Sequence, residues 1–354
     1  MSSTDFPLPA SMRALHAEAQ GQPLTVKTVA TPQPGPGSLV VKVLAVSIEP
    51  DIQEIINGKM PYLYTPTPFT PCGRAVGRVA AIGPDTTTLS IGQLVTIEPF
   101  VRGRDNSDVK ALWGLGVFGE DPKAKKLIEF WRDGSLAEYV KTPLENVYAL
   151  NEKRLLGSPA EGGLGYSLGD LSLLARYLVP YGGFRGIDLK AGETVIVAPA
   201  TGLFSSAAVE LASAMGARVV AVGRNLSKLQ KLAAANERVE IVQTSGNFEE
   251  DLAKTKALGP IDAYMDLSPT EANGSSYIRA CLMSLRDYGR ASLMGVTTND
   301  IDIPYMIAVM NNLTIRDSIC GMEIVGEFSI EQWDEGIKAV AQNSEPGKMA
   351  VMYF

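Results

Sequence analysis

The chain has 354 residues, 45% of them hydrophobic and 20% charged, and 32 Lys and Arg against 39 Asp and Glu give a formal net charge of −7. This length exceeds one ordinary hydrophobic core and predicts two domains, and the composition excludes a disordered or fibrous protein. The acidic balance, without any Lys/Arg-rich run, excludes nucleic acid and anionic lipid as expected partners and leaves a small-molecule substrate.

The cysteine pattern and the absence of long apolar runs indicate the compartment. Cys72, Cys281 and Cys320 lie far apart in the sequence, which fits buried thiols in a reducing environment better than a disulfide framework or a metal site. No apolar run approaches the ~18–20 residues that span a bilayer, and the first residues lack the features of a signal peptide. We therefore expect a cytoplasmic protein with no membrane partner.

The first part of the chain, from Met12 to about Leu150, consists of short segments rich in β-branched residues and separated by Gly and Pro. This punctuation predicts a β-rich, barrel-like domain. The predicted strands lie within residues 12–18, 24–30, 38–48, 73–83, 92–101 and 137–143. The polar segment 102–134, with a short helix expected at 125–131, is either a binding loop or a surface insertion.

From about Gly157 the pattern changes to alternating helices and apolar strands, beginning with a helix at 171–179. The alternation predicts a doubly wound parallel sheet of the Rossmann type, an α/β fold. The predicted elements are strands 193–198, 217–222, 239–242, 261–267 and 290–295 and helices 203–215 and 226–236. The end of the chain returns to mixed character, so the predicted domains are 1–156 with 313–354, and 157–312 between them.

A tight turn at 198–208 joins the first strand of this sheet to a helix. Such a turn directs backbone amides and the positive end of the helix dipole at a diphosphate. The usual glycine fingerprint is degraded, because Pro199, Leu203 and Ser205 replace glycines and only Gly202 remains. Taken alone, the motif also fits an ordinary βα turn of a flavodoxin-like or hydrolase-like sheet.

The end of the next strand indicates which dinucleotide binds. No acid follows Gly223, where an NAD site would hold a carboxylate for the ribose hydroxyl. Arg224 offers a planar fork for a 2′-phosphate, and Lys228 a second charge, although both also fit a solvated surface. These residues favour NADPH over NADH. Asn225 can also cap the next helix. The predicted cofactor-binding residues are Ala200, Thr201, Gly202, Leu203, Phe204, Gly223, Arg224, Asn225, Lys228, Leu267, Gly295 and Val296.

Motifs along nearly the whole chain resemble the medium-chain dehydrogenase/reductase family, in particular its fungal, zinc-free, alcohol dehydrogenase-like members. They are PGPGSLVVKV at 34–43, SIEPD at 47–51, PCGRAVGRV at 71–79, WRDGSLAEYV at 131–140, LKAGETVIVAPATG at 189–202, MGARVVAVGRN at 215–225, GRASLMGV at 289–296 and NLTIR at 312–316. The resemblance implies a GroES-like catalytic domain made of both chain ends, a central Rossmann domain and a cleft between them.

The departures from the family pattern predict that no metal is bound. Where zinc-dependent relatives carry ligands, this chain has Glu49, Gly73 and, near the third position, Leu174, and 102–134 has no four-cysteine loop. A catalytic zinc needs three protein ligands and an open position. The sole histidine, His16, lies on a predicted N-terminal strand and fits a strand residue better than a ligand.

Without zinc or a cleft histidine, the developing negative charge must be stabilised by neutral donors, which suits a conjugated substrate. We expect an NADPH-dependent enoyl or enone reductase, of the kind used in secondary metabolism. The resemblance implies cleft residues at Tyr62 and Tyr64 and a proton-relay position near Asp51, so these are the candidate catalytic residues. The tyrosines also fit rim packing, and the aspartate a turn or cap.

Two other functions stay open at this point: a carbonyl reductase or alcohol dehydrogenase, and a non-redox ligand-binding or cyclising protein. Relatives often dimerise through the last Rossmann strands, and the apolar segment 301–307 predicts a homodimer.

Overall fold

The computed structural model describes residues 8–48, 52–60, 63–297, 300–317, 324–329 and 349–353. They divide into two compact units. The first holds the described residues up to Leu173 together with two strands from near the chain end, and the second holds the described residues from Leu174 to Asp317. The domain bounds given above remain predictions.

The sheet of the first unit is organised around β3 (Ser38–Ile48), whose 11 residues are buried except for Lys42 and, in part, Leu44. Burial on both faces explains why this strand is a nearly continuous apolar run. The described strands follow the order β11-β6-β5-β3-β19-β18, and β10 also pairs with β3. The other bounds are β5 (Ala75–Ile82), β6 (Leu94–Ile97), β10 (Tyr139–Pro143), β11 (Val147–Ala149), β18 (Ile324–Ser329) and β19 (Met349–Tyr353).

Smaller elements surround this sheet. The strand pairs are β1 (Ser11–His16) with β2 (Thr25–Ala30), β4 (Leu63–Tyr64) with β9 (Val117–Phe118) and β7 (Phe100–Arg102) with β8 (Lys110–Leu112). The helices are α1 (Ile52–Ile56), α2 (Pro122–Phe130), α3 (Glu152–Leu156) and α4 (Leu168–Ser172), with single turns at Leu144–Asn146 and Pro159–Glu161. The short helix expected within 102–134 is thus confirmed as α2.

The second unit contains a parallel sheet with the strand order β14-β13-β12-β15-β16-β17 among its described strands. The bounds are β12 (Thr194–Ala198), β13 (Arg218–Gly223), β14 (Val239–Gln243), β15 (Ile261–Asp266), β16 (Leu285–Leu293) and β17 (Thr314–Asp317). This order, with β12 and β15 side by side at the centre, confirms the doubly wound sheet. Because β17 pairs with β16, the sheet extends past residue 312.

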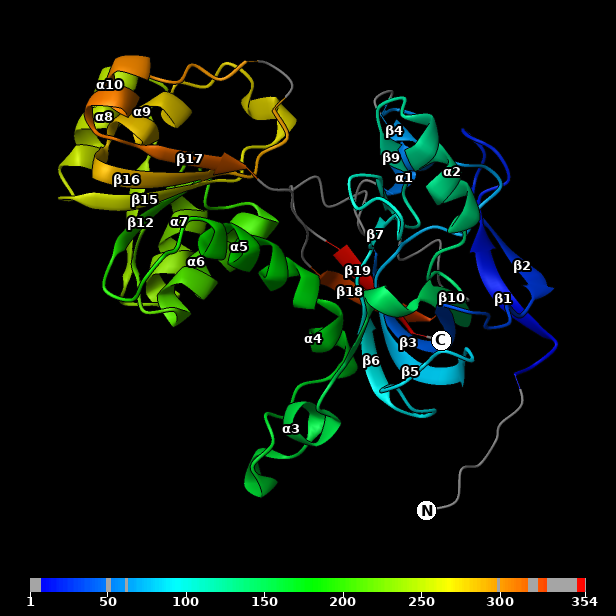
Figure 1. Cartoon of the computed structure of the whole chain (residues 1–354). Helices are drawn as coiled ribbons and strands as arrows, with labels where there is room; N and C mark the ends of the chain where they lie inside the picture. The colour runs from blue at the N-terminus through cyan, green and yellow to red at the C-terminus, as the bar shows by residue number, and fades with distance from the viewer. Residues whose placement is uncertain are drawn as a thin grey trace. The chain divides into compact units, whose positions relative to one another are not determined.

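Helices cover both faces of this sheet (Figure 1). Their bounds are α5 (Leu174–Gly186), α6 (Leu203–Ala214), α7 (Leu226–Ala235), α8 (Phe248–Lys256), α9 (Tyr277–Met283), α10 (Tyr305–Met310) and a single turn at Thr270–Ala272. Val195 and Val197 of β12 pack in the core toward α5, α6 and α7, whereas Ile196 and Ala198 pack in the core toward α9. Alternate residues of one strand therefore enter opposite cores.

One predicted helix end is wrong. The helix expected to stop at residue 179, before Pro180, instead breaks near Leu173 and continues through Pro180 to Gly186. A proline inside a helix removes one backbone hydrogen bond. Burial of Phe184, which is fully enclosed in the core of the second unit, accompanies the continuation.

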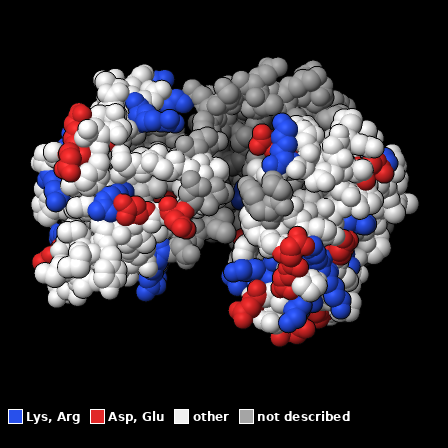
Figure 2. Space-filling model, turned by 90° about the horizontal axis from the view of Figure 1, so that it is seen from above, with Lys and Arg blue, Asp and Glu red and all other residues white. Residues whose placement is uncertain are grey.

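Charged side chains of both signs are interspersed on the described surface that Figure 2 shows, without a broad field of one sign. The described part of this face therefore offers no extended positive patch to a polyanion. In the part of the chain that the structure describes, no helix has the length and apolar character needed to cross a membrane.

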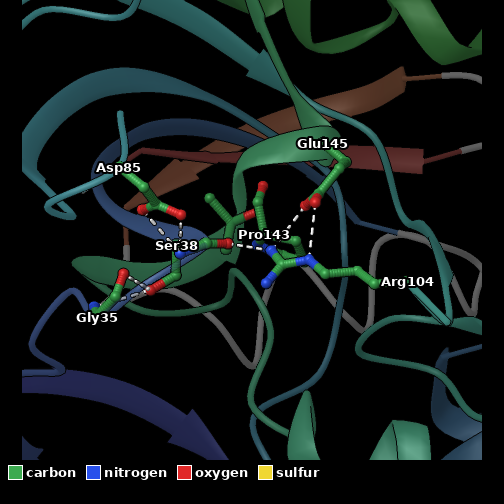
Figure 3. A network of polar contacts seen from close by, with 8 residues as sticks. Gly35, Ser38, Asp85, Arg104, Pro143 and Glu145 are labelled. Atoms are coloured by element: carbon green, nitrogen blue, oxygen red, sulfur yellow. Dashed lines mark hydrogen bonds and ion pairs between the residues drawn. The ribbon is translucent and has the colours of Figure 1, made fainter. Parts of the chain in front are cut away.

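Arg104 attaches the start of the 102–134 segment to the β-rich unit (Figure 3). Its guanidinium donates to both carboxylate oxygens of Glu145, at 2.7 and 2.9 Å, and also to the carbonyl oxygen of Gly37. The backbone amide of Gly37 in turn donates to Asp85 at 2.8 Å. Gly37 has φ +69°, which residues with a side chain rarely adopt, so the turn favours glycine; a Cβ there would also displace the Arg104 guanidinium, a nitrogen of which lies 1.9 Å from that position. This end of the segment is thus fixed by a bidentate pair.

Candidate cofactor-binding site

The turn after β12 carries the residues predicted to hold the diphosphate. Helix α6 begins at Leu203 with Gly202 as its N-cap, and the amide of Gly202 donates to Ser205 Oγ at 2.9 Å. Ser205, which replaces a fingerprint glycine, is 2% exposed. The serine therefore satisfies the N-cap amide of α6 from within the protein. Of the neighbouring predicted residues, Ala200 and Leu203 are buried, and Thr201 and Phe204 are partly exposed.

The end of β13 presents Arg224 to solvent. The side chain of Asn225 accepts a hydrogen bond from the amide of Lys228 at 3.0 Å, which confirms the predicted cap of α7. Arg224 itself is exposed, and none of the described carboxylates forms an ion pair with it. A guanidinium without a carboxylate partner keeps its donors available for an anion.

A pocket of about 490 Å³ lies against Arg224, entirely within the second unit. Its walls come from the carboxyl ends of β12, β13, β14 and β15, where a doubly wound sheet binds nucleotides. Lining residues include Pro199, Val222, Gly223, Arg224, Thr244, Ser245, Gly246, Asp251, Pro269 and Tyr277. The pocket thus brings together Gly223 and Arg224 of the predicted set.

Asp251 stabilises the wall that follows β14. This residue is 2% exposed, and its carboxylate accepts from the amide and hydroxyl of Ser245, at 2.7 and 2.9 Å, and from the amide of Gly246 at 3.2 Å. On the facing loop, Ser276 Oγ donates to the carbonyl oxygen of Gly246 at 3.4 Å. The carboxylate lining the pocket is therefore hydrogen-bonded by donors of its own loop.

The remaining predicted cofactor residues lie at the ends of β15 and β16. Leu267 donates its amide to Ala198 O at 3.0 Å, and Val296 donates to Ser268 O at 2.8 Å. A Cβ on Gly295 would lie 2.6 Å from a carboxylate oxygen of Asp266, so this position requires glycine. Of the three, Val296 is the most exposed, at 53%.

Sequence reasoning missed a buried polar network beside the pocket. Asp266 Oδ1 accepts hydrogen bonds from Tyr264 OH, at 2.9 Å, and from Ser268 Oγ, and Ser268 Oγ lies 2.6 Å from Tyr277 OH. Burial raises the pKa of Asp266, while the hydrogen bonds from Ser268 and Tyr264 oppose the rise. Burial also raises the pKa of Tyr277, so its phenol keeps its proton at neutral pH. The sequence signal that could have revealed this network is the placement of polar residues at alternate positions where the buried strand β15 ends.

Among the predicted catalytic residues, the structure describes Tyr64; Tyr62 and Asp51 lie outside the described residues. Tyr64 OH donates to Glu129 Oε1 on α2 at 2.5 Å, and Lys125 Nζ lies 4.7 Å from the centre of its ring. The hydrogen bond to Glu129 raises the pKa of Tyr64. The phenol therefore stays protonated at neutral pH and links β4 to α2.

Position 73, where the family resemblance implies a zinc-binding histidine, cannot hold a side chain. A Cβ on Gly73 would lie 2.1 Å from the carbonyl oxygen of Trp113 and 2.9 Å from Pro99 Cβ. The residue at the third expected position, Leu174, begins α5 and has no donor atom in its side chain, and Glu49 lies outside the described residues. The donor set at these positions does not fit a catalytic zinc.

Comparison with known proteins agrees with this fold. Residues 35–152 match the alcohol dehydrogenase GroES-like domain, and residues 205–342 match the zinc-binding dehydrogenase domain. An alcohol dehydrogenase of Rhizobium meliloti is 26% identical over 356 residues, covering 96% of this chain and 97% of that protein. A trans-enoyl reductase of Penicillium crustosum is 27% identical over 220 residues, covering 60% of this chain and 52% of that protein.

A solved structure shares the fold as well. The short-chain alcohol dehydrogenase rspB of E. coli, determined in complex with NADH, aligns with a TM-score of 0.73 at 14% identity and covers 98% of this chain and 100% of that chain. The GroES-like and dehydrogenase domains occur in order on a chain with a doubly wound sheet. The chain therefore belongs to the medium-chain dehydrogenase/reductase family of nicotinamide dinucleotide-binding oxidoreductases.

Proposed function

We propose that this oxidoreductase uses NADPH, without zinc, to reduce a small conjugated enoyl or enone compound. The observation that carries the cofactor assignment is Arg224 at the end of β13, exposed on the pocket wall with no described carboxylate pairing with it. Arg224 would hold the 2′-phosphate, with Lys228 as a second charge, and the turn at 200–204 would face the diphosphate. NADPH supplies a hydride when it is bound.

The test of the cofactor assignment is Arg224→Ala, titrated with NADPH and with NADH by nicotinamide fluorescence. Charge-assisted hydrogen bonds are worth roughly 1.5–3 kcal/mol, so NADPH affinity should fall by about one to two orders of magnitude while NADH affinity stays nearly unchanged. Lys228→Ala should have a smaller effect, because a flexible point charge is screened more strongly. Lys231→Ala, an exposed lysine on the same helix, is the matched control. Equal loss of both cofactors would contradict the assignment.

The zinc-free part of the proposal is supported by Gly73, whose Cβ position is filled by the backbone of Trp113. Activity should persist in strong chelator, and the purified protein should lack stoichiometric zinc. Elemental analysis with about one zinc per chain would contradict this part. The proposed chemistry then relies on neutral donors for the charge that develops on the substrate oxygen.

The comparisons favour two substrate classes, which kinetic assays distinguish. Similarity to a trans-enoyl reductase, and to fungal members of the family, favours a conjugated substrate and a role in secondary metabolism. Similarity to an alcohol dehydrogenase over 96% of the chain favours a second candidate, a carbonyl reductase or alcohol dehydrogenase. Nicotinamide absorbance assays on enones, saturated ketones and alcohols separate the two. Cofactor binding without turnover of any of these would favour a non-redox protein.

Tyr64, Tyr62 and Asp51 remain the proposed catalytic residues, and Tyr64 is the one whose surroundings are described. Its phenol is protonated at neutral pH, and the proton that it donates to Glu129 would have to be redirected to a substrate carbon during reduction. Tyr64→Phe should lower kcat with little change in NADPH affinity, because the phenol lies in the unit that does not hold the pocket. Tyr148→Phe, an exposed tyrosine of β11, serves as the control. Unchanged kcat in Tyr64→Phe would assign the phenol to holding α2 only.

We also propose a homodimer. Helix α10 exposes Tyr305, Met306, Val309 and Met310 at 74%, 65%, 52% and 69%. Helix α10 precedes in the chain β17, the last described strand in the order of the parallel sheet, and overlaps the segment 301–307. Contiguous exposed apolar residues favour association.

A further inference from the structure

The buried network beside the pocket ends on a pocket-lining side chain. Tyr264, Asp266 and Ser268 are each at most 1% exposed, whereas Tyr277 lines the pocket. The order of contacts is Tyr264 to Asp266, Asp266 to Ser268, and Ser268 to Tyr277. A fully buried carboxylate therefore determines how the hydroxyl of the pocket-lining Tyr277 is oriented.

The direction of each hydrogen bond follows from the protons available. A carboxylate only accepts, and Asp266 accepts from Tyr264, from the hydroxyl of Ser268 and from backbone amides, which can only donate. Ser268 has a single hydroxyl proton, and Asp266 takes it. The contact of 2.6 Å between Ser268 Oγ and Tyr277 OH must then use the proton of Tyr277. The phenol oxygen is left with lone pairs only, so toward a ligand of the pocket that Tyr277 lines it can act only as an acceptor.

An acceptor at this position disfavours a phosphate group, which also offers acceptor oxygens, and favours a ligand group that donates a hydrogen bond. Arg224, on the wall formed by β13, is the cation for the phosphate, whereas Tyr277 begins α9 on the wall that follows β15. A ribose hydroxyl both donates and accepts, so an acceptor does not discriminate it. The exocyclic amino group of adenine can only donate a hydrogen bond to the Tyr277 oxygen. In hypoxanthine, the corresponding 6-oxo base, a carbonyl oxygen replaces this amino group and can only accept.

We propose that Tyr277 accepts a hydrogen bond from the exocyclic amino group of the adenine base, and that the pocket thereby distinguishes adenine dinucleotides from their hypoxanthine counterparts. This inference rests on the proposed binding of NADPH to the same pocket. Tyr277 is the contacting residue, and Ser268 and Asp266 are positioning residues that keep its proton away from the ligand.

The experiment compares NADPH with reduced nicotinamide hypoxanthine dinucleotide phosphate, titrated by nicotinamide fluorescence. With NADPH, Tyr277 gains a hydrogen bond from the amino group, whereas with the hypoxanthine dinucleotide its oxygen faces another acceptor. The wild-type protein should therefore bind NADPH roughly tenfold more tightly than the hypoxanthine dinucleotide. Tyr277→Phe should bring the ratio of the two Kd values to about one. The ratio is read on the folded, binding-competent protein, so a partial loss of folded material does not change it.

Ser268→Ala tests the positioning role. Without the serine oxygen, the Tyr277 proton is free to point into the pocket, so the preference should move toward the hypoxanthine dinucleotide. Tyr264→Phe is the matched control, because it removes a donor from Asp266 at a buried residue that does not line the pocket, and it should leave the ratio unchanged. A wild-type ratio near one, or an unchanged ratio in both Tyr277→Phe and Ser268→Ala, would overturn the inference while NADPH binding itself survives. Absence of NADPH binding to the wild-type protein would overturn both this inference and the proposed function.

Discussion

Replacement of Gly73 by alanine should destabilise the first unit strongly. The added Cβ would lie 2.1 Å from the carbonyl oxygen of Trp113. That carbonyl has little freedom to move, because the Trp113 amide donates to Pro99 O at 2.8 Å and its indole donates to Asp133 O at 3.0 Å. Trp113 itself is fully buried. Overpacking of this kind costs about 1–3 kcal/mol, and contact with fixed backbone puts Gly73→Ala near the upper figure.

Calorimetry measures this effect. A domain of this size loses roughly 2–4 °C of Tm per kcal/mol, so Gly73→Ala should lower the transition of the first unit by about 6–12 °C. The matched control is Gly182→Ala in α5, where a Cβ meets nothing within 4 Å. This change should raise stability by up to about 1 kcal/mol, because alanine is the better helix former. If Gly73→Ala unfolded at or above the wild-type temperature, the steric reasoning and its support for a zinc-free site would both fail.

Three further changes test other parts of the structure. Gly37→Ala should destabilise the β-rich unit in thermal unfolding, because the position has φ +69° and Arg104 fills the Cβ site; an unchanged melting temperature would contradict that geometry. The Arg104 hydrogen bond lowers the pKa of Glu145. The contribution of this pair to the free energy of unfolding is therefore present above the unfolded pKa of about 4.5 and is lost as pH falls through the lowered value. Both side chains are over half exposed, so Glu145→Gln should cost only about 0–1 kcal/mol at pH 7, a difference that should vanish in unfolding curves at low pH. Met306→Lys with Met310→Lys should give a monomeric mass in light scattering if α10 forms the dimer interface, and an unchanged dimer would place the interface elsewhere.

The fold could be predicted from the sequence because local patterns and tertiary burial agree. The apolar run 38–48 became β3 with those bounds, and the strand predicted at 193–198 is β12, Thr194–Ala198. Both strands are buried on their two faces, so their sequences are apolar throughout and easily recognised. The helix predicted to end at 179 failed because tertiary packing outweighed the local effect of Pro180.

The candidate site was less predictable. Arg224 and the Asn225 cap are local features, which sequence position reveals. Tyr277 reaches Ser268 only because α9 packs against the sheet beyond β15, and no spacing in the sequence encodes that contact. The role of Ser205 also required coordinates, since a missing glycine says nothing about which amide the replacing side chain satisfies.

The pairing of one end of β3 with β19 affects when the sheet of the first unit can be completed during synthesis. On one side of this strand, β10 covers Ser38–Lys42, and β19 covers Ala45–Ile48. The ribosome synthesises Met349–Tyr353 about three hundred residues after β3, and by then it has synthesised all described strands of the parallel sheet in the second unit. Until then, the Ala45–Ile48 end of β3 presents unpaired amides and carbonyls to other nascent chains. The described strands of the second unit can thus pair during translation, whereas the sheet of the first unit is completed only when β19 has been synthesised.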